Sequence, residues 1–121
     1  MKTPNADDNM AAKAADLPQI SFAKRPMLRE WLEINHASSS GVLVRIYKKS
    51  SKIESITFED LLEEGLCFGW SESQRFKGSE EYYLQKFTPR KTRGTVSDRN
   101  KRLIAKLEAS GQMTEAGRAK L

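Results

Sequence analysis

Two short segments of alternating side chains, joined by a turn, constrain the fold of this chain more than any other feature. The first spans residues 68–76, and its alternation places these side chains on one face: Phe68, Trp70, Glu72, Gln74 and Phe76. The second spans residues 81–87 and is rich in Tyr and Phe, and the sequence Lys77-Gly78-Ser79 between them is typical of a turn. Two alternating segments around a turn predict a β-hairpin.

The position of the turn predicts which residues face each other across this hairpin. A turn centred near residues 78–79 places Trp70 opposite Phe87, Glu72 near Gln85, and Gln74 near Tyr83. These side chains would then share one face of the strand pair. A slip of one residue would move these side chains of one strand to the opposite face of the hairpin, so the register decides which side chains share a face.

Two helices and one more strand are predicted before the hairpin. Apolar residues at helical spacing predict helices over residues 26–36 and 58–66, the second opened by a capping box from Thr57 and Asp60. The acidic residues of that second helix are expected to face water: Glu59, Glu63 and Glu64. The β-branched run at residues 42–47 predicts a strand whose core-facing residues are Val42, Val44 and Ile46.

Two further helices are predicted after the hairpin, over residues 97–110 and 114–121, where Ser97 and Thr114 can cap the first turns. Gly111 stands where a helix C-terminus commonly has a glycine. The complete pattern predicts an α+β domain, with a small, mostly antiparallel sheet built around the hairpin and packed by helices.

The length of 121 residues indicates one domain, which we place at residues 20–121. Residues 1–19 are rich in Ala, Asp, Asn and Pro without apolar periodicity, and are predicted to form a disordered tail. No apolar run approaches the ~18 residues of a membrane helix, and the polar, acidic start does not resemble a signal peptide. With the single Cys67 excluding an internal disulfide, these features predict a cytoplasmic protein without membrane insertion.

The net charge of +5 is concentrated in one segment, because residues 86–106 hold eight basic residues and one acidic residue. A local basic patch favours an anionic partner, which could be a phosphate compound, a nucleic acid or an acidic protein face. A solvated helix face that only improves solubility is the alternative interpretation.

The hairpin and the basic loop after it supply the candidate ligand-binding residues, which are Trp70, Glu72, Gln85, Phe87, Arg90 and Arg93. The two arginines would hold an anion, since a planar guanidinium donates two parallel hydrogen bonds to phosphate or carboxylate. The aromatic pair would form an apolar floor, and the Glu and Gln would orient the ligand. Alternatively, the aromatic pair belongs to the core and the carboxylate pairs with an arginine.

A catalytic site is only weakly indicated. Glu72 beside Trp70 could be a desolvated general base, but the sequence offers no second carboxylate or nucleophile–base pair to complete a hydrolytic site. His36 and Cys67 are single and far apart, so no metal-ligand set is predicted, and no cofactor motif is present. A second alternative is a single-stranded nucleic-acid-binding module that uses the aromatic residues and the basic segment 86–106.

Three segments in fixed order carry a resemblance to a known bacterial family. They are residues 66–70 (Leu-Cys-Phe-Gly-Trp), 83–90 (Tyr-Leu-Gln-Lys-Phe-Thr-Pro-Arg) and 111–117 (Gly-Gln-Met-Thr-Glu-Ala-Gly). Together with residues 31–36 and 47–49, they resemble the YdeI/OmpD-associated family, also named for bacteriocin protection, over roughly residues 17 to 121.

The chain departs from that family's pattern in the hairpin and beyond it. Members usually carry Ile-Asp-Gly where this chain has Ser71-Glu72-Ser73, and Trp-Ser where it has Val96-Ser97. Many members also continue with a further helical segment. The resemblance implies a non-enzymatic domain in envelope stress or in tolerance of bacteriocins and cationic peptides. It carries over no reaction, cofactor or catalytic residue. The expected function is therefore binding of an anionic ligand or protein partner.

Overall fold

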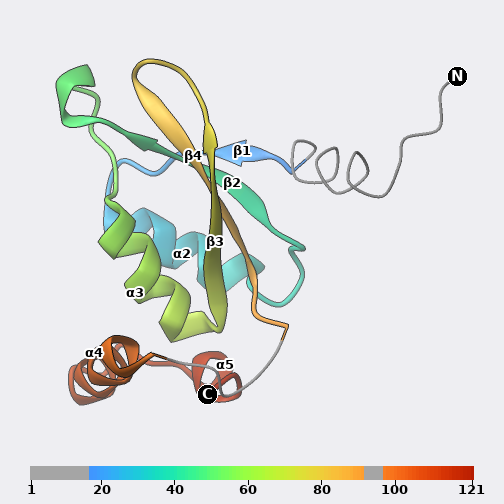
Figure 1. Ribbon diagram of the computed structural model, residues 1–121. Coiled ribbons are helices and arrows are strands. Elements are labelled where there is room, and N and C mark those ends of the chain that lie inside the picture. The colour runs from blue at the N-terminus through green and yellow to red at the C-terminus, as the bar shows by residue number, and fades with distance from the viewer. Residues whose placement is uncertain (1–16, 92–96) are drawn as a thin grey trace, which may run out of the picture.

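A four-stranded sheet lies at the centre of the computed structural model, which describes residues 17–91 and 97–121 (Figure 1). Its strands are β1 (Gln19–Ile20), β2 (Val42–Tyr47), β3 (Trp70–Lys77) and β4 (Tyr82–Pro89), in the spatial order β1-β2-β4-β3. The short β1 runs parallel to β2, while β2 with β4 and β4 with β3 are antiparallel. The predicted small, mostly antiparallel sheet is therefore confirmed. Residues 1–16 of the tail predicted for residues 1–19 lie outside the described part of the chain.

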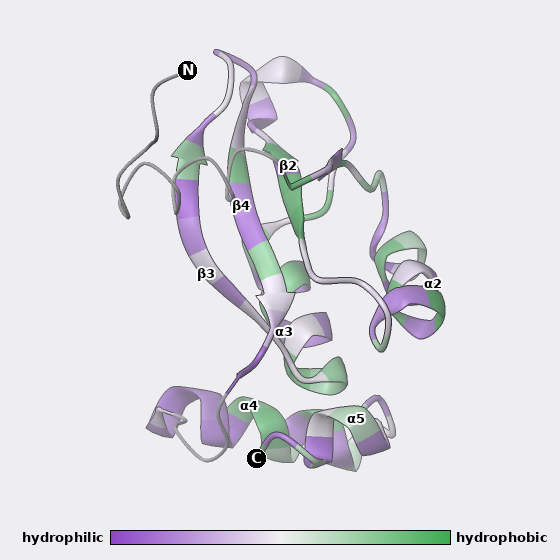
Figure 2. Ribbon diagram, turned by 90° about the vertical axis from the view of Figure 1, so that its right-hand side faces the viewer, coloured by the Kyte–Doolittle hydropathy of each residue, from purple (hydrophilic) through white to green (hydrophobic). Residues whose placement is uncertain are grey.

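In the described residues the helices are α2 (Arg25–Asn35), α3 (Phe58–Phe68), α4 (Asp98–Ala109) and α5 (Glu115–Arg118), with a short 3₁₀ turn η1 (Lys49–Ser51) after β2. Both α2 and α3 pack on one face of the sheet, and α4 and α5 lie together at one end of it (Figures 1 and 2). This arrangement confirms the predicted α+β fold with its four helices. None of the helices in residues 17–91 and 97–121 is long and apolar enough to cross a membrane.

Helix α3 begins as its sequence predicts but ends later. The Thr57 hydroxyl accepts from the Asp60 N–H at 3.2 Å, and the Asp60 carboxylate accepts from the Thr57 N–H at 3.0 Å, which completes the capping box. Phe68, predicted as the start of the hairpin, instead completes the helix. Gly69 stops it in the left-handed conformation, with φ of 74°, and β3 begins at the next residue.

The predicted hairpin register is wrong by two residues at the start of β3 and by three at its end. Trp70 stands opposite Pro89 and Glu72 opposite Phe87, and only after a β-bulge between Glu72 and Arg75 does Arg75 reach its partner Gln85. The bulge inserts an extra residue into β3, so Phe76 turns to the face opposite Trp70. An alternating pattern does not reveal such an insertion, because the polar residues within it fit either face.

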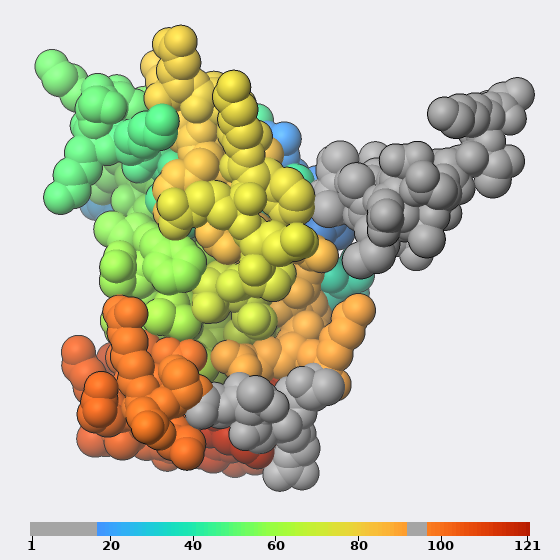
Figure 3. All heavy atoms as spheres, in the orientation of Figure 1, coloured from blue at the N-terminus to red at the C-terminus, as the bar shows by residue number. Residues whose placement is uncertain are grey.

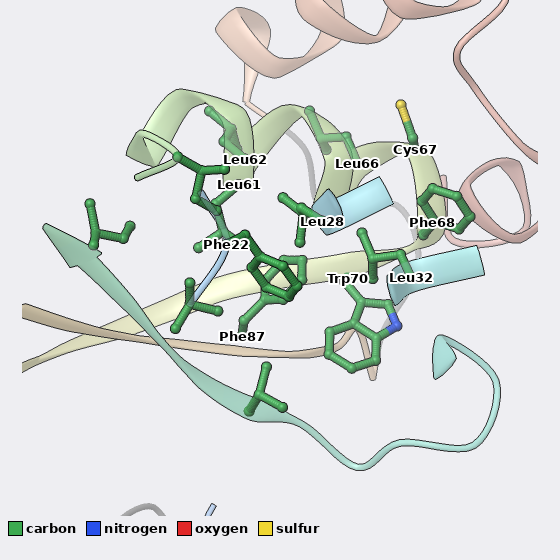
Figure 4. Close-up of a cluster of buried hydrophobic side chains, with 14 of the residues drawn as sticks. Phe22, Leu28, Leu32, Leu61, Leu62, Leu66, Cys67, Phe68, Trp70 and Phe87 are labelled. Atoms are coloured by element: carbon green, nitrogen blue, oxygen red, sulfur yellow. The ribbon is translucent and has the colours of Figure 1, made fainter. Parts of the chain in front are cut away.

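The hydrophobic core lies between the sheet and helices α2 and α3 (Figure 4). Trp70 and Phe87 are only 1% and 0% exposed, with ring centroids 5.0 Å apart, and Trp31 meets Trp70 edge-on at 5.5 Å. The predicted inward residues of β2 also belong to this core: Val42, Val44 and Ile46. Trp70 and Phe87 of the hairpin therefore stabilise the domain from within the core.

Candidate functional site

The predicted ligand-binding residues of the hairpin divide into enclosed and accessible members. The core rings of Trp70 and Phe87 are not presented to a ligand. Gln85 is 4% exposed and donates to the Gln74 carbonyl at 3.0 Å, so it holds the bulge of β3 in place. Arg93 lies outside the described residues. Only Glu72 and Arg90 remain as candidates for direct ligand contact in this group.

Glu72 and Arg90 each keep a buried polar atom without a hydrogen-bond partner, namely Glu72 Oε2 and Arg90 Nε. Burial raises the pKa of the Glu72 carboxyl, although its own backbone N–H and the positive charge of Arg90 oppose this rise. The Arg75 guanidinium does not pair with this carboxylate and lies over the Tyr83 ring, 4.0 Å from its centroid. Unsatisfied buried polar atoms are rare in proteins, so this pair at the base of the hairpin is a candidate polar contact for a ligand.

A groove of about 270 Å³ lies between α3 and α4. Its floor is apolar, its α4 wall is basic and its α3 wall is acidic, with the lining residues Glu59, Leu62, Glu63, Arg99, Arg102, Leu103 and Lys106. In Figure 3 the atoms of α4 lie directly below those of α3, at the lower left of the molecule. The groove is thus formed by two helices that are far apart in the sequence.

The basic wall consists of Arg99, Arg102 and Lys106, which the i, i+3, i+7 spacing places on one face of α4. Ser97 starts this helix, since its hydroxyl accepts from the Asn100 N–H at 3.2 Å. None of the three basic side chains forms an ion pair with any residue in the described part of the chain. The sequence indicated the basic segment 86–106, but not which of its residues would share a groove.

The acidic wall is partly neutralised. Glu63 pairs with Arg25 at 3.0 Å, while Glu59 has no ion pair within residues 17–91 and 97–121. The lining therefore combines three unpaired cations with one unpaired carboxylate. Such a groove can bind an anionic group against α4 and a hydrogen-bond donor against α3.

A buried ionic network joins α2 and α3 beside the core, and the sequence reasoning missed it. Glu64, predicted to face water, is 2% exposed and accepts from Arg25 Nε at 3.3 Å and from Arg29 Nη1 at 3.2 Å. Both arginines also reach Gln112, in the connection between α4 and α5, at 2.9 and 2.8 Å. The i, i+4 spacing of the two arginines on α2 is the signal that could have indicated a shared carboxylate partner.

No group of three or more His, Cys, Asp or Glu side chains that could hold a metal ion occurs among the described residues. The His36 ring nitrogen Nδ1 lies 2.8 Å from the Leu32 carbonyl at the end of α2. Cys67 is fully buried, and this burial raises the pKa of its thiol, so the thiol is neither exposed nor activated as a nucleophile.

The chain matches the family model described as domain of unknown function DUF8412 over residues 20–120, and it belongs to that family. No curated protein and no solved structure matches the chain.

Proposed function

We propose that this DUF8412 domain is a binding module that receives the anionic group of a ligand or protein partner in the groove between α3 and α4. The observation that carries this proposal is the row of three unpaired cations, Arg99, Arg102 and Lys106, along one wall of the groove. Aligned cations without a carboxylate partner create a positive potential, and guanidinium groups bind phosphate or carboxylate in a planar, two-pronged geometry. The apolar floor adds contact area for the rest of the ligand.

The opposite wall narrows the chemistry of the ligand. Since Arg25 engages Glu63, the unpaired Glu59 is left as a hydrogen-bond acceptor across from the cations. This arrangement favours a ligand that carries an anionic group together with a hydroxyl or amine donor, such as a phosphosugar or an acidic peptide. A volume of about 270 Å³ suits one such group rather than a large cofactor, since pockets for drug-sized ligands measure ~300–1,000 Å³.

The cellular setting of the proposal follows from the resemblance to the YdeI/OmpD-associated family. We place this binding in envelope stress or in tolerance of bacteriocins and cationic peptides, in a cytoplasmic protein. Arg90, whose Nε has no partner, does not line the groove and offers a separate donor for an anion at the base of the hairpin. The relation to that family and this setting rest on the quoted motifs.

A thermal-shift screen tests the proposal with inorganic phosphate, nucleotides, phosphosugars and acidic peptides as probes. We expect stabilisation by at least one of these anions, weaker at high salt and lost in Arg99→Gln/Arg102→Gln/Lys106→Gln. The matched control replaces the same number of positive charges at exposed lysines elsewhere, in Lys49→Gln/Lys52→Gln/Lys77→Gln. Stabilisation lost equally in both variants, or absent for all probes, would refute a specific groove.

An enzyme that uses Glu72 as a general base is the second candidate, favoured by the raised pKa and the unpartnered oxygen of this carboxyl. Glu72 does not line the groove between α3 and α4, so a substitution of Glu72 distinguishes the enzyme from the binding module. In Glu72→Gln, the binding module keeps its stabilisation by the anion. The enzyme would instead convert a stabilising probe to a product visible by mass spectrometry, and lose that conversion in the same variant.

A further inference from the structure

We propose that the sheet face turned away from the helices is a second binding surface, and that its ligand is single-stranded nucleic acid. This surface, called here the outer face, is formed by side chains of all four strands on the side opposite the core. In Figures 1 and 2, α2 and α3 lie on the other side of the sheet. The inference is independent of the groove between α3 and α4.

The strand register assigns the residues of the outer face to three cross-strand rows. The rows are Tyr47–Tyr82, then Arg45–Leu84–Phe76, then Gln19–Leu43–Lys86. Residues paired across strands share a face, and every second residue along a strand returns to it. The face therefore carries aromatic rings in its first two rows and one basic side chain in each of its second and third rows.

The aromatic rings and the cations form the accessible part of this face. Leu43 and Leu84 are only 3% and 7% exposed, although they lie outside the core cluster. The Tyr47 and Tyr82 rings lie 5.1 Å apart, and the Arg45 guanidinium lies over the Tyr82 ring, 4.9 Å from its centroid. A ligand thus meets half-buried tyrosine rings and a stacked guanidinium, both of which offer flat surfaces to a base.

The charge of the outer face complements phosphate. Arg45 and Lys86 are its cations, and neither forms an ion pair with a described residue. Glu72 is the only acidic residue in the four strands, and it faces the core side, opposite Phe87. The strand positions of the outer face carry no acid, and the exposed Glu80 and Glu81 lie in the turn before Tyr82. This combination of flat rings and cations matches the way single-strand binders stack bases and hold phosphates.

Single strands suit this face better than duplexes or acidic proteins. In a duplex the bases are already stacked on each other, so tyrosine rings on an open sheet gain little from them. An acidic protein would use the two cations but would leave the stacked aromatic rows unexplained. The pairing of rings with cations therefore selects the ligand class.

The test is fluorescence polarisation with a labelled oligothymidylate of about 12 nucleotides, which lies within the site size of single-strand binders. Two phosphate contacts give a slope of log K against log salt of about −1.4, or about sevenfold weaker binding at ~200 mM than at ~50 mM salt. We expect Arg45→Gln/Lys86→Gln to bring this slope near zero. Tyr82→Leu should weaken binding by about fivefold or more through loss of stacking, whereas Tyr82→Phe should bind within about twofold of the unchanged protein.

The controls separate the outer face from the groove and from loss of folding. Circular dichroism melting must show that each variant is folded. If Tyr82→Leu does not fold, Tyr82→Phe serves as the folded comparison. Arg99→Gln/Arg102→Gln/Lys106→Gln should keep its affinity for the oligothymidylate. The inference is overturned by any of three results: no binding at ~50 mM salt, equal binding of a duplex, or loss of binding in the α4 variant alone. A fourth result would also overturn it: binding of an acidic peptide, but not of the oligothymidylate, that is lost in Arg45→Gln/Lys86→Gln and kept in the α4 variant.

Discussion

Replacing Glu64 by Gln is expected to remove about 2–3 kcal/mol from the free energy of unfolding. Breaking a buried ion pair from one side costs ~3–5 kcal/mol, because the remaining charge stays buried without its partner. Here the cost is at the lower end or below, since the side chains of Arg25 and Arg29 keep 28% exposure. Both also keep hydrogen bonds to Gln112, at 2.9 and 2.8 Å. For a domain of this size the expected loss lowers Tm by roughly 10–20 °C.

Urea unfolding followed by far-UV circular dichroism measures this loss. The midpoint should fall by about 1–2 M with an unchanged m-value, because the substitution alters stability and not the surface exposed on unfolding. The matched control is Glu33→Gln, whose carboxylate also pairs with Arg29, at 3.7 Å, but is 60% exposed, so its loss should cost below about 0.5 kcal/mol. Equal midpoints for Glu64→Gln and Glu33→Gln would refute the structural role assigned to the network.

Three further predictions follow from the packing. Gly117→Ala should destabilise the domain by about 3 kcal/mol in thermal unfolding, since a Cβ atom there would lie 2.6 Å from the Leu66 carbonyl oxygen. Gly111→Ala should cost only about 1 kcal/mol, because a Cβ atom there meets no neighbour and only the φ of 77° is unfavourable. Burial raises the pKa of Glu72, so the native state resists ionisation of this carboxyl and should lose stability as pH rises from the ordinary carboxyl pKa through the raised one. Glu72→Gln should therefore gain stability relative to the unchanged protein over this rise, and a pH-independent difference in urea midpoint would contradict this. The fully buried Cys67 should react with a thiol reagent at least about 1,000-fold more slowly in the native state than in urea, and comparable rates would contradict its burial.

Local signals in the sequence sufficed for most elements of the fold. The capping box of Thr57 and Asp60 and the β-branched run of β2 act through neighbouring residues, so the sequence displays them directly. The end of α3 was less visible, because Leu66, Cys67 and Phe68 fit a helix or a strand equally well. There the left-handed conformation of Gly69 decides the boundary.

The parts that were missed depend on contacts between distant residues. The burial of Glu64 follows from two arginines 35 and 39 positions earlier, and no property of α3 by itself indicates it. The groove likewise needs α3 and α4 to meet, which the sequence does not specify. The sequence therefore predicted a basic segment. It did not predict that Arg99, Arg102 and Lys106 of this segment form one wall of a groove.

The β-bulge in β3 also limits how this domain can associate with other chains. Strand β3 is one edge of the sheet, and the strand at the other edge, β1, has only two residues. A bulged edge with the exposed charges of Arg75 and Lys77 resists pairing with a foreign strand, and an edge of two residues offers too short a template. Extension of the sheet by a bound peptide backbone is thereby blocked at both edges. Recognition by this domain is left to its side chains.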